Sequence, residues 1–252
     1  MNEIGIVPDW PAPVNVRALQ TIRDGGVSVG PYAYLNLGDH VGDDPVAVAR
    51  NRALLRATLP ADPVWLKQVH GNIVADADRT AGVPDADASV ARKAGAICAV
   101  MTADCLPLLL CDEAGTVVAA VHAGWRGLAG GVVEATVKAM NVAPEQLLVW
   151  LGPAIGPAAF EVGDEVRQAF MAHDPQAAKA FVSSPSLRTQ DSELGTKKWL
   201  ADIYLLARQR LALLGVKQVC GGGLCTYTDA ERFYSYRRDQ ATGRMASLIW
   251  LA

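Results

Sequence analysis

Three consecutive apolar runs constrain the fold of this chain most strongly. They span residues 96–103, 106–111 and 116–121 and contain almost no polar side chains. A strand with one face in solvent alternates apolar and polar residues, whereas a strand covered on both faces reads as a continuous apolar run. The runs therefore predict neighbouring strands of a sheet that is covered on both faces.

Helical and strand patterns interleave along the rest of the chain, but several adjacent strands have no helix between them. This arrangement predicts a mixed sheet rather than a doubly wound parallel one. We expect one α/β (α+β) domain over residues 1–252. Its helices are predicted near residues 45–55, 128–140, 164–173 and 199–214, and further strands near 14–22, 147–151 and 218–222. Asp44 and Pro45 are typical of the start of the first helix.

Turn signals give four more local predictions. Asp24, Gly25 and Gly26 predict a hairpin turn into a strand over 27–29. Residues 64–69 and 72–77 are predicted as two strands that meet near His70, and 232–238 and 245–251 as a terminal strand pair. Residues 174–196 are polar and contain prolines, which predicts a loop.

Composition excludes several classes of partner. Hydrophobic residues make up 51% of the chain and charged residues 19%, which favours a globular enzyme over a disordered chain. The net charge of −3 offers no basic surface for nucleic acid. No apolar run reaches the roughly 18 residues that span a membrane, and the N-terminus lacks a signal-peptide pattern. Five cysteines without a C-x-x-C pair indicate reduced thiols in a cytoplasmic protein.

His70, Cys105 and His122 are the strongest candidates for chemistry, because each is expected where a strand ends. The chain has four histidines, and two of them occupy such positions. Two imidazoles and one thiolate form a three-ligand zinc set that leaves the fourth tetrahedral position open, as catalytic sites do. The alternative interpretation is two ordinary strand-end histidines and a buried cysteine.

Six sequence blocks carry a resemblance to a known family. They are NLGDHVGD (36–43), KQVHG (67–71), TADCLP (102–107), HAGWRG (122–127), LGPAIG (151–156), and CT (225–226) followed by FYSYRRD (233–239). In this order they resemble the laccase-domain (YfiH-like) family, which has been called multicopper polyphenol oxidase and later purine nucleoside phosphorylase. The resemblance implies a four-layer α/β/β/α domain with one zinc on His70, Cys105 and His122. It also implies phosphorolysis of adenosine, inosine and methylthioadenosine, and deamination of adenosine.

Deamination at C6 of adenine needs water activated by the metal and a group that moves a proton. Nucleobase deaminases carry an H-x-E motif for this purpose, and no histidine of this chain is followed by one. Asp104 is the nearest carboxylate in sequence to the candidate ligands. It is predicted either as a catalytic proton shuttle or as a turn residue that orients its neighbours.

Phosphorolysis also needs a phosphate site, for which arginine suits well because its planar fork can donate two hydrogen bonds. Gly124 and Gly127 can in addition expose backbone N–H groups to an anion, or simply permit a tight turn. The predicted substrate and phosphate contacts are Arg52, Gln68, Arg126, Arg237 and Arg244, with Arg238 as a further arginine of the same region.

Other functions use the same residues differently. In one alternative the protein is a metal-free cysteine hydrolase, with Cys105 as nucleophile and His122 or His70 as base. Such an enzyme would be an amidase that acts on a UDP-muramoyl-serine precursor. A copper-loaded polyphenol oxidase is another alternative, but four histidines are too few for a multicopper cluster, although one copper ion can replace zinc. A zinc-stabilised binding module needs a fourth ligand from Cys111, Cys225 or His40. We expect a monomer or weak homodimer.

Overall fold

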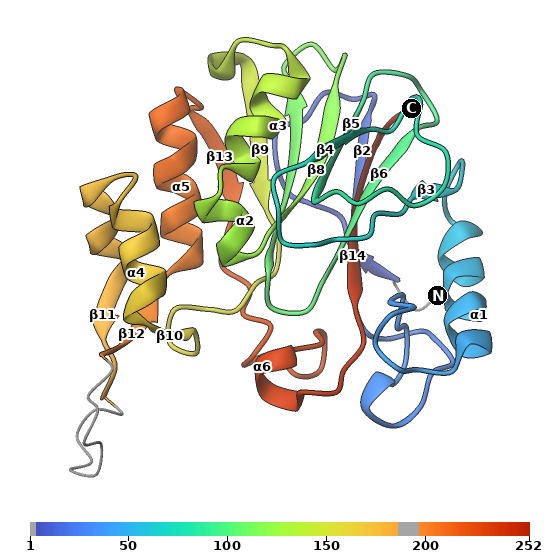
Figure 1. Ribbon diagram of the computed structural model, residues 1–252. Helices are drawn as coiled ribbons and strands as arrows, with labels where there is room; N and C mark the ends of the chain where they lie inside the picture. The colour runs from blue at the N-terminus through green and yellow to red at the C-terminus, as the bar shows by residue number, and fades with distance from the viewer. Residues whose placement is uncertain (1–3, 186–196) are drawn as a thin grey trace.

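The computed structural model describes residues 4–185 and 197–252, which form two sheets packed face to face with helices outside them (Figure 1). The first sheet has the order β1 (Gly5–Ile6), β2 (Val16–Thr21), β14 (Met245–Leu251), β6 (Ile97–Thr102), β3 (Pro63–Val64). The second has the order β13 (Gln218–Gly221), β9 (Leu147–Leu151), β7 (Leu106–Asp112), β8 (Val118–Ala123), β5 (Ala88–Ala91), β4 (Val74–Asp76). Both sheets contain parallel and antiparallel pairs, so the predicted mixed topology is confirmed.

The apolar runs became strands whose two faces are both covered. In β6, Cys98 and Val100 point into the core between the two sheets, whereas Ala99 points to the outer core beneath α1 (Pro45–Arg56). In β7, Leu109 lies in the core between the sheets and Leu110 in the core under the opposite helices. Burial on both sides explains why these strands carry no polar alternation.

Helices complete four layers, as predicted. α1 covers the outer face of the first sheet through Val48 and Leu55. The outer face of the second sheet is covered by α2 (Trp125–Ala129), α3 (Val132–Met140) and α5 (Ile203–Leu214), and α4 (Asp164–Met171) packs beside α2. These helices lie on the opposite side of the molecule from α1 (Figure 1). Among the described residues, no helix is both long enough and apolar enough to span a membrane.

Helix boundaries follow local signals. Asp44 accepts a hydrogen bond from the Val46 amide and Pro45 occupies the first turn, as predicted for the start of α1. The helix predicted over 128–140 is instead divided into α2 and α3, because Gly131 takes a left-handed conformation with φ +87°. The helix predicted from residue 199 begins at Ile203, since residues before it belong to a strand.

A third, small sheet contains that strand. Its order is β10 (Glu161–Gly163), β12 (Lys198–Ala201), β11 (Phe181–Ser183). The loop predicted over 174–196 is therefore wrong for Phe181–Ser183 and for the 3-10 helix Pro175–Ala180, while its residues 186–196 lie outside the described part of the chain. Other 3-10 turns are Gly30–Tyr32 and Pro144–Gln146.

Two strand pairings predicted in the N-terminal half of the chain are absent from the described residues. Residues 27–29 follow a turn, but they lie outside the strands because the Val27 amide donates to the Asn51 side chain. The predicted strands at 64–69 and 72–77 shortened to β3 and β4, which belong to different sheets. The chain between β3 and β4 turns sharply at His70, whose φ is +60°.

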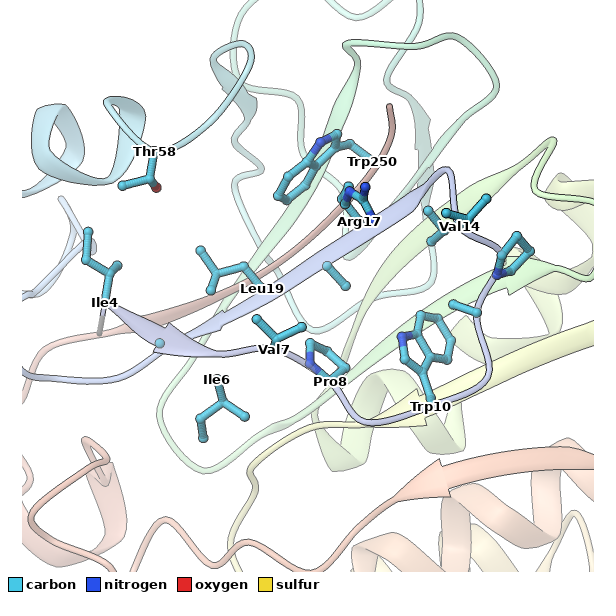
Figure 2. Close-up of a pocket in the computed structure, with 15 residues that line it drawn as sticks. Ile4, Ile6, Val7, Pro8, Trp10, Val14, Arg17, Leu19, Thr58 and Trp250 are labelled. Atoms are coloured by element: carbon cyan, nitrogen blue, oxygen red, sulfur yellow. The ribbon is translucent and has the colours of Figure 1, made fainter. Parts of the chain in front are cut away.

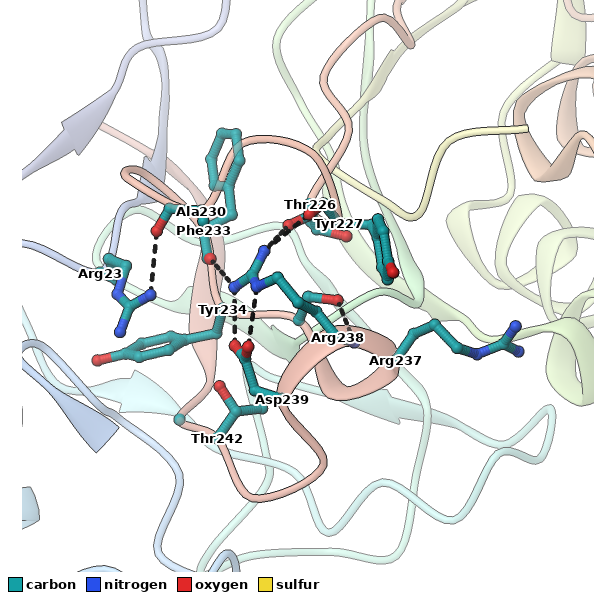
Figure 3. A network of polar contacts seen from close by, with 12 residues as sticks. Arg23, Thr226, Tyr227, Ala230, Phe233, Tyr234, Arg237, Arg238, Asp239 and Thr242 are labelled. Carbon is teal, nitrogen blue, oxygen red and sulfur yellow. Dashed lines mark hydrogen bonds and ion pairs between the residues drawn. The ribbon is translucent and has the colours of Figure 1, made fainter. Parts of the chain in front are cut away.

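The predicted strand over 232–238 is also wrong, because this segment forms a loop and the short helix α6 (Tyr236–Asp239). Ser235 caps α6 by accepting a hydrogen bond from the Arg238 amide. The Arg238 guanidinium donates to the carbonyl oxygens of Thr226, Tyr227 and Phe233 and pairs with Asp239 (Figure 3). Through these contacts Arg238 stabilises the loop.

A hollow of about 840 Å³ lies along the N-terminal segment (Figure 2). Its lining is mainly apolar and includes Pro8, Trp10, Val14 and Trp250. Arg17 is its one charged lining residue among the described residues. The hollow contains none of the predicted site residues, and the chemistry-bearing side chains gather elsewhere.

Candidate metal centre

The fold brings His70, Cys105 and His122 together at one end of the central strands β7 and β8 of the second sheet. His122 lies in β8, and Cys105 occupies the turn between β6 and β7. The pairing of β7 with β8 sets Leu106 opposite Ala123, which carries the preceding Cys105 to the end of β8. His70 reaches the same point from the turn between β3 and β4.

The geometry of the three side chains suits a metal ion. Their ligand atoms all lie within 4.8 Å of one another, and Cys105 Sγ is 3.8 Å from His70 Nε2. Tetrahedral zinc with bonds of about 2.0–2.3 Å holds its ligand atoms about 3.3–3.8 Å apart. Small side-chain movements would therefore bring these three ligand atoms to zinc-binding distances. His122 is buried, Cys105 is half-buried and His70 is exposed. One side of the group is thus open to a substrate.

Gly124 provides the space in which the ligands meet. A Cβ at this position would lie 2.8 Å from His70 Cδ2 and 3.0 Å from Cys105 Sγ. At Gly127 a Cβ would lie 2.8 Å from the carbonyl oxygen of Gly71. Close approach of the two turns therefore explains both glycines of the HAGWRG block, in line with the tight-turn interpretation.

Charges within the group are strongly coupled. Burial raises the pKa of the Cys105 thiol, but the His122 and His70 rings outweigh burial and lower it to about 6. Burial lowers the pKa of His122, while Cys105 and Asp87 raise it to about 9. Thiolate is the ligand form of cysteine, so the neighbouring imidazoles favour the ligand form of Cys105, whereas His122 must release a proton when a metal binds.

Asp87 is the residue of the candidate site that sequence reasoning missed. It immediately precedes β5, and its buried carboxylate lies 2.8 Å from Nδ1 of His122. Burial raises the pKa of Asp87, but hydrogen bonds from His122 and Gly71 hold it below its ordinary value. A single acidic residue before an apolar strand was the available sequence signal, and such residues are common at turns.

Two hollows flank the group. The first, about 270 Å³, is lined largely by apolar residues, among them Trp125, Ile155 and Phe160. The second, about 420 Å³, is more polar and is lined by His40, Gln68 and Arg244 among others. His70, Ala103, Cys105 and Tyr236 line both, so two of the candidate ligands, His70 and Cys105, lie at the junction, while His122 lines the second hollow.

The predicted arginines are divided between these hollows. Arg126 and Arg237 line the first and Arg244 lines the second. Arg52 is in the lining of neither: its Nε donates to the Leu37 carbonyl, Nη2 pairs with Asp39 at 3.2 Å, and its guanidinium lies over Trp65. The structure therefore does not bring Arg52 to the candidate ligands.

Several lining side chains are already held by other groups. The Gln68 amide exchanges two hydrogen bonds with the backbone of Met101. The Arg126 guanidinium lies 4.4 Å from the centre of the Trp125 ring. Arg237 Nη1 donates to the Glu161 carbonyl, and Figure 3 shows this side chain extending away from the Arg238 network. Arg244 Nη1 donates to the carbonyl oxygens of Thr242 and Gly243.

Asp104 connects the Cys105 turn to α6. One carboxylate oxygen accepts a hydrogen bond from the Thr226 hydroxyl and the other from the Arg237 amide, each at 2.6 Å. Asp104 also adopts a left-handed conformation with φ +95°. Both oxygens are thus occupied by structural contacts, which favours the turn-orienting interpretation over the proton shuttle.

No fourth ligand joins the group within residues 4–185 and 197–252. Cys111 is buried in the core between the sheets, where burial raises its thiol pKa to about 12. Cys225 Sγ accepts a hydrogen bond from the Gly156 amide at 3.2 Å. His40 is exposed in the second hollow. The described residues therefore leave a three-ligand group, as an open catalytic site requires.

Comparison with known proteins identifies the family. The model of the family described as multi-copper polyphenol oxidoreductase laccase matches residues 17–252. The chain belongs to this laccase-like family. A member from Escherichia coli K12, purine nucleoside phosphorylase YfiH, is 56% identical over 98% of both chains. Purine nucleoside phosphorylase SCO2081 of Streptomyces coelicolor is 42% identical, covering 92% of this chain and 93% of that protein.

Solved structures of the laccase-like family share the fold. The Neisseria meningitidis protein NMB0706 superposes with a TM-score of 0.90 at 52% identity and covers 99% of both chains. YlmD from Geobacillus stearothermophilus gives a TM-score of 0.82 at 29% identity over 98% of this chain and 99% of that one. The laccase-domain (YfiH-like) resemblance and the architecture that it implied are therefore confirmed.

Proposed function

We propose that this protein is a metal-dependent purine nucleoside phosphorylase. The observation that carries the proposal is the three-ligand group at the junction of one apolar and one polar hollow. The names of the relatives from Escherichia coli and Streptomyces coelicolor point to the same activity.

In this proposal the purine base occupies the first hollow and phosphate the second. Trp125, Ile155 and Phe160 offer an apolar lining of the kind that binds an aromatic base. Arg244 brings a guanidinium to the second hollow, where it can donate to an anion. The ribose then lies between them, beside His70 and Cys105.

The reaction joins a phosphate oxygen to C1′ of the ribose as the bond from C1′ to the purine nitrogen breaks. The products are ribose 1-phosphate and the free base, which takes up a proton. A metal held by His70, Cys105 and His122 supplies a Lewis acid when bound. The chain's own contribution is to position phosphate through Arg244 and to keep the base against the apolar wall.

We further propose zinc as the native metal, because two imidazoles and a thiolate match its usual ligands. Copper can compete for the same donors by the affinity order of divalent metals. The four histidines of the chain do not suffice for a multicopper cluster, which favours phosphorolysis over the oxidase activity in the family's description. Proposed substrates are adenosine, inosine and methylthioadenosine, with deamination of adenosine as a second reaction, in a cytoplasmic monomer or weak homodimer.

A second candidate function is a metal-free cysteine hydrolase, acting as an amidase on a UDP-muramoyl-serine precursor. The lowered thiol pKa of Cys105, about 6, favours it, because thiolate is also the nucleophile of such enzymes. Activity that survives strong chelation would separate this candidate from the phosphorylase.

The proposal is tested by incubating protein of defined metal content with adenosine, with and without phosphate, and identifying every product. When phosphate is present, we expect the free bases adenine and hypoxanthine together to equal ribose 1-phosphate in amount, and without phosphate we expect inosine and ammonia only. Absence of free base at all phosphate concentrations, with zinc bound and the protein folded, would refute phosphorolysis.

A further inference from the structure

Asp87 is a fully buried carboxylate next to the candidate metal ligands, and the reaction proposed above does not use it. It lies directly before β5, which pairs with β8, the strand that carries the candidate ligand His122. Buried carboxylates are stable when their oxygens accept several hydrogen bonds. The partners of Asp87 therefore indicate what it does.

Both oxygens of Asp87 are used by residues of the metal group or their direct neighbours. Oδ1 is 2.8 Å from Nδ1 of His122 and accepts from the His70 amide at 2.9 Å. Oδ2 accepts from the amides of Gly71 at 2.6 Å and Val69 at 3.2 Å. One carboxylate thus contacts the side chain of one candidate ligand and the backbone of another.

The contact with His122 selects its tautomer. An ionised carboxylate can only accept hydrogen bonds, so Nδ1 of His122 carries the proton. In the neutral ring, which is the form that binds a metal, Nε2 then carries the free lone pair. Ligand histidines in metal sites are commonly oriented by a carboxylate in this way.

The backbone contacts hold the turn that carries His70. Three successive amides, those of Val69, His70 and Gly71, converge on the Asp87 carboxylate, as in the anion-binding nests formed by short backbone segments. His70 has φ +60°, a left-handed conformation that is uncommon for residues other than glycine. An anion beneath the amides stabilises this conformation and so fixes the direction of the His70 side chain.

We propose that Asp87 is the positioning residue that preorganises both imidazole ligands, His122 through its ring and His70 through its backbone. This role rests on the proposed metal centre but not on the identity of the substrate. Asp87 also offsets charge, because zinc with two neutral imidazoles and one thiolate retains a formal charge of +1, and the carboxylate brings the site to neutrality.

The test measures zinc affinity by competition with a chelator, without any nucleoside. In Asp87→Asn an NH₂ group replaces one acceptor oxygen and faces hydrogen-bond donors. We expect zinc to bind about 10- to 100-fold more weakly, the usual effect of losing such a partner of a metal ligand.

Asp112→Asn is the matched control. Asp112 is also a buried carboxylate, and it accepts hydrogen bonds from the amides of Thr116 and Val117, at the opposite end of β7 from Cys105. Its loss removes comparable contacts from the same sheet, so we expect lower stability and unchanged zinc affinity. Equal zinc affinity in folded Asp87→Asn and wild-type protein would overturn the proposal, as would equal weakening in the control.

A second measurement uses wild-type protein and does not depend on a variant that folds. Nitrogen-15 NMR of histidine-labelled, zinc-loaded protein should show a protonated Nδ1 and a metal-bound Nε2 for His122. Metal bound through Nδ1 would contradict the role of Asp87 whatever the enzyme catalyses. Conversely, absence of phosphorolysis with the expected tautomer and zinc affinities would refute the proposed function alone.

Discussion

Cys105 is the residue at which the two candidate chemistries diverge. Burial raises its thiol pKa, and the imidazoles of His122 and His70 lower it to about 6, so the thiolate is available either as a ligand or as a nucleophile. We expect Cys105→Ser to bind far less zinc than the wild-type value of about one per chain, because serine is a poor zinc ligand at neutral pH. Phosphorolysis should be lost together with the metal, which elemental analysis and a phosphorolysis assay on the same sample would check.

Chelation of the wild-type protein provides the control for this variant. If Cys105 is a metal ligand, chelated wild-type protein and Cys105→Ser should both be inactive. Added zinc should then restore the activity of the wild-type protein only. If chelated wild-type protein instead cleaves an amide substrate while Cys105→Ser does not, the cysteine acts as a nucleophile without metal.

Arg244 gives a second prediction at this scale. It lines the polar hollow beside the candidate ligands, and its loss removes a charge-assisted contact worth about 1.5–3 kcal/mol. Arg244→Ala should therefore raise the KM for phosphate about ten- to a hundred-fold, with zinc content unchanged. Arg244→Lys should restore little, because an ammonium group cannot form the bidentate contact. Steady-state kinetics with phosphate as the varied substrate measure both effects.

Arg52→Ala is the comparison for Arg244, since Arg52 is held by Leu37, Asp39 and Trp65 outside both hollows. We expect its KM for phosphate to stay within about twofold of wild type, because sites without shared contacts couple by no more than about 0.5 kcal/mol. A larger effect for Arg52→Ala than for Arg244→Ala would return the phosphate site to Arg52.

Sequence reasoning identified residues by chemical type and failed where a role depends on position alone. His70, Cys105 and His122 are rare or reactive side chains at turns, so they could be selected before the fold was known. Asp87 is one of many acidic residues, and its contacts with Val69, His70, Gly71 and His122 exist only after β5 and β8 have paired.

Among the elements, the segment before β14 shows how side-chain contacts override a strand pattern. The aromatic residues at 233, 234 and 236 favour a strand. However, the Arg238 guanidinium donates to three carbonyl groups of the same loop, and Ser235 caps α6. The backbone groups that a strand would use for pairing are partly occupied within the loop. No pattern of hydropathy could reveal this, because the decisive residue is a charged one.

Asp104 anchors this segment to the Cys105 turn, which yields a prediction at the scale of the element. In Asp104→Asn the side-chain oxygen can still accept from the Arg237 amide and the NH₂ group can donate to Thr226, so α6 should stay in place and activity should remain within about tenfold of wild type. Asp104→Gly keeps the left-handed backbone without strain but removes both contacts, and it should impair substrate binding more strongly.

Kinetic pH profiles of the two variants check this assignment. An anchoring role predicts that Asp104→Asn retains the wild-type profile for both phosphorolysis and deamination. Selective loss of deamination in Asp104→Asn, with normal phosphorolysis, would instead make Asp104 the proton shuttle.

For the whole molecule, the uninterrupted apolar runs were enough to predict strands covered on both faces, and the laccase-domain (YfiH-like) resemblance implied the four layers. The distribution of strands between the two sheets could not be predicted, because it depends on long-range pairing. β14, at the C-terminus, inserts between β2 and β6, while β7 follows β6 directly in sequence but lies in the other sheet. The candidate centre depends on this crossing, since the connection between β6 and β7 carries Cys105 to the end of β8.

The central claim is that phosphorolysis depends on one metal ion held by His70, Cys105 and His122. Its most direct test is a titration of metal-free protein with zinc in the presence of adenosine and phosphate, recording the rate of adenine release against zinc bound. The account predicts a rate proportional to occupancy that saturates at about one zinc per chain. Full activity of the metal-free protein, unchanged as zinc is added, would contradict it.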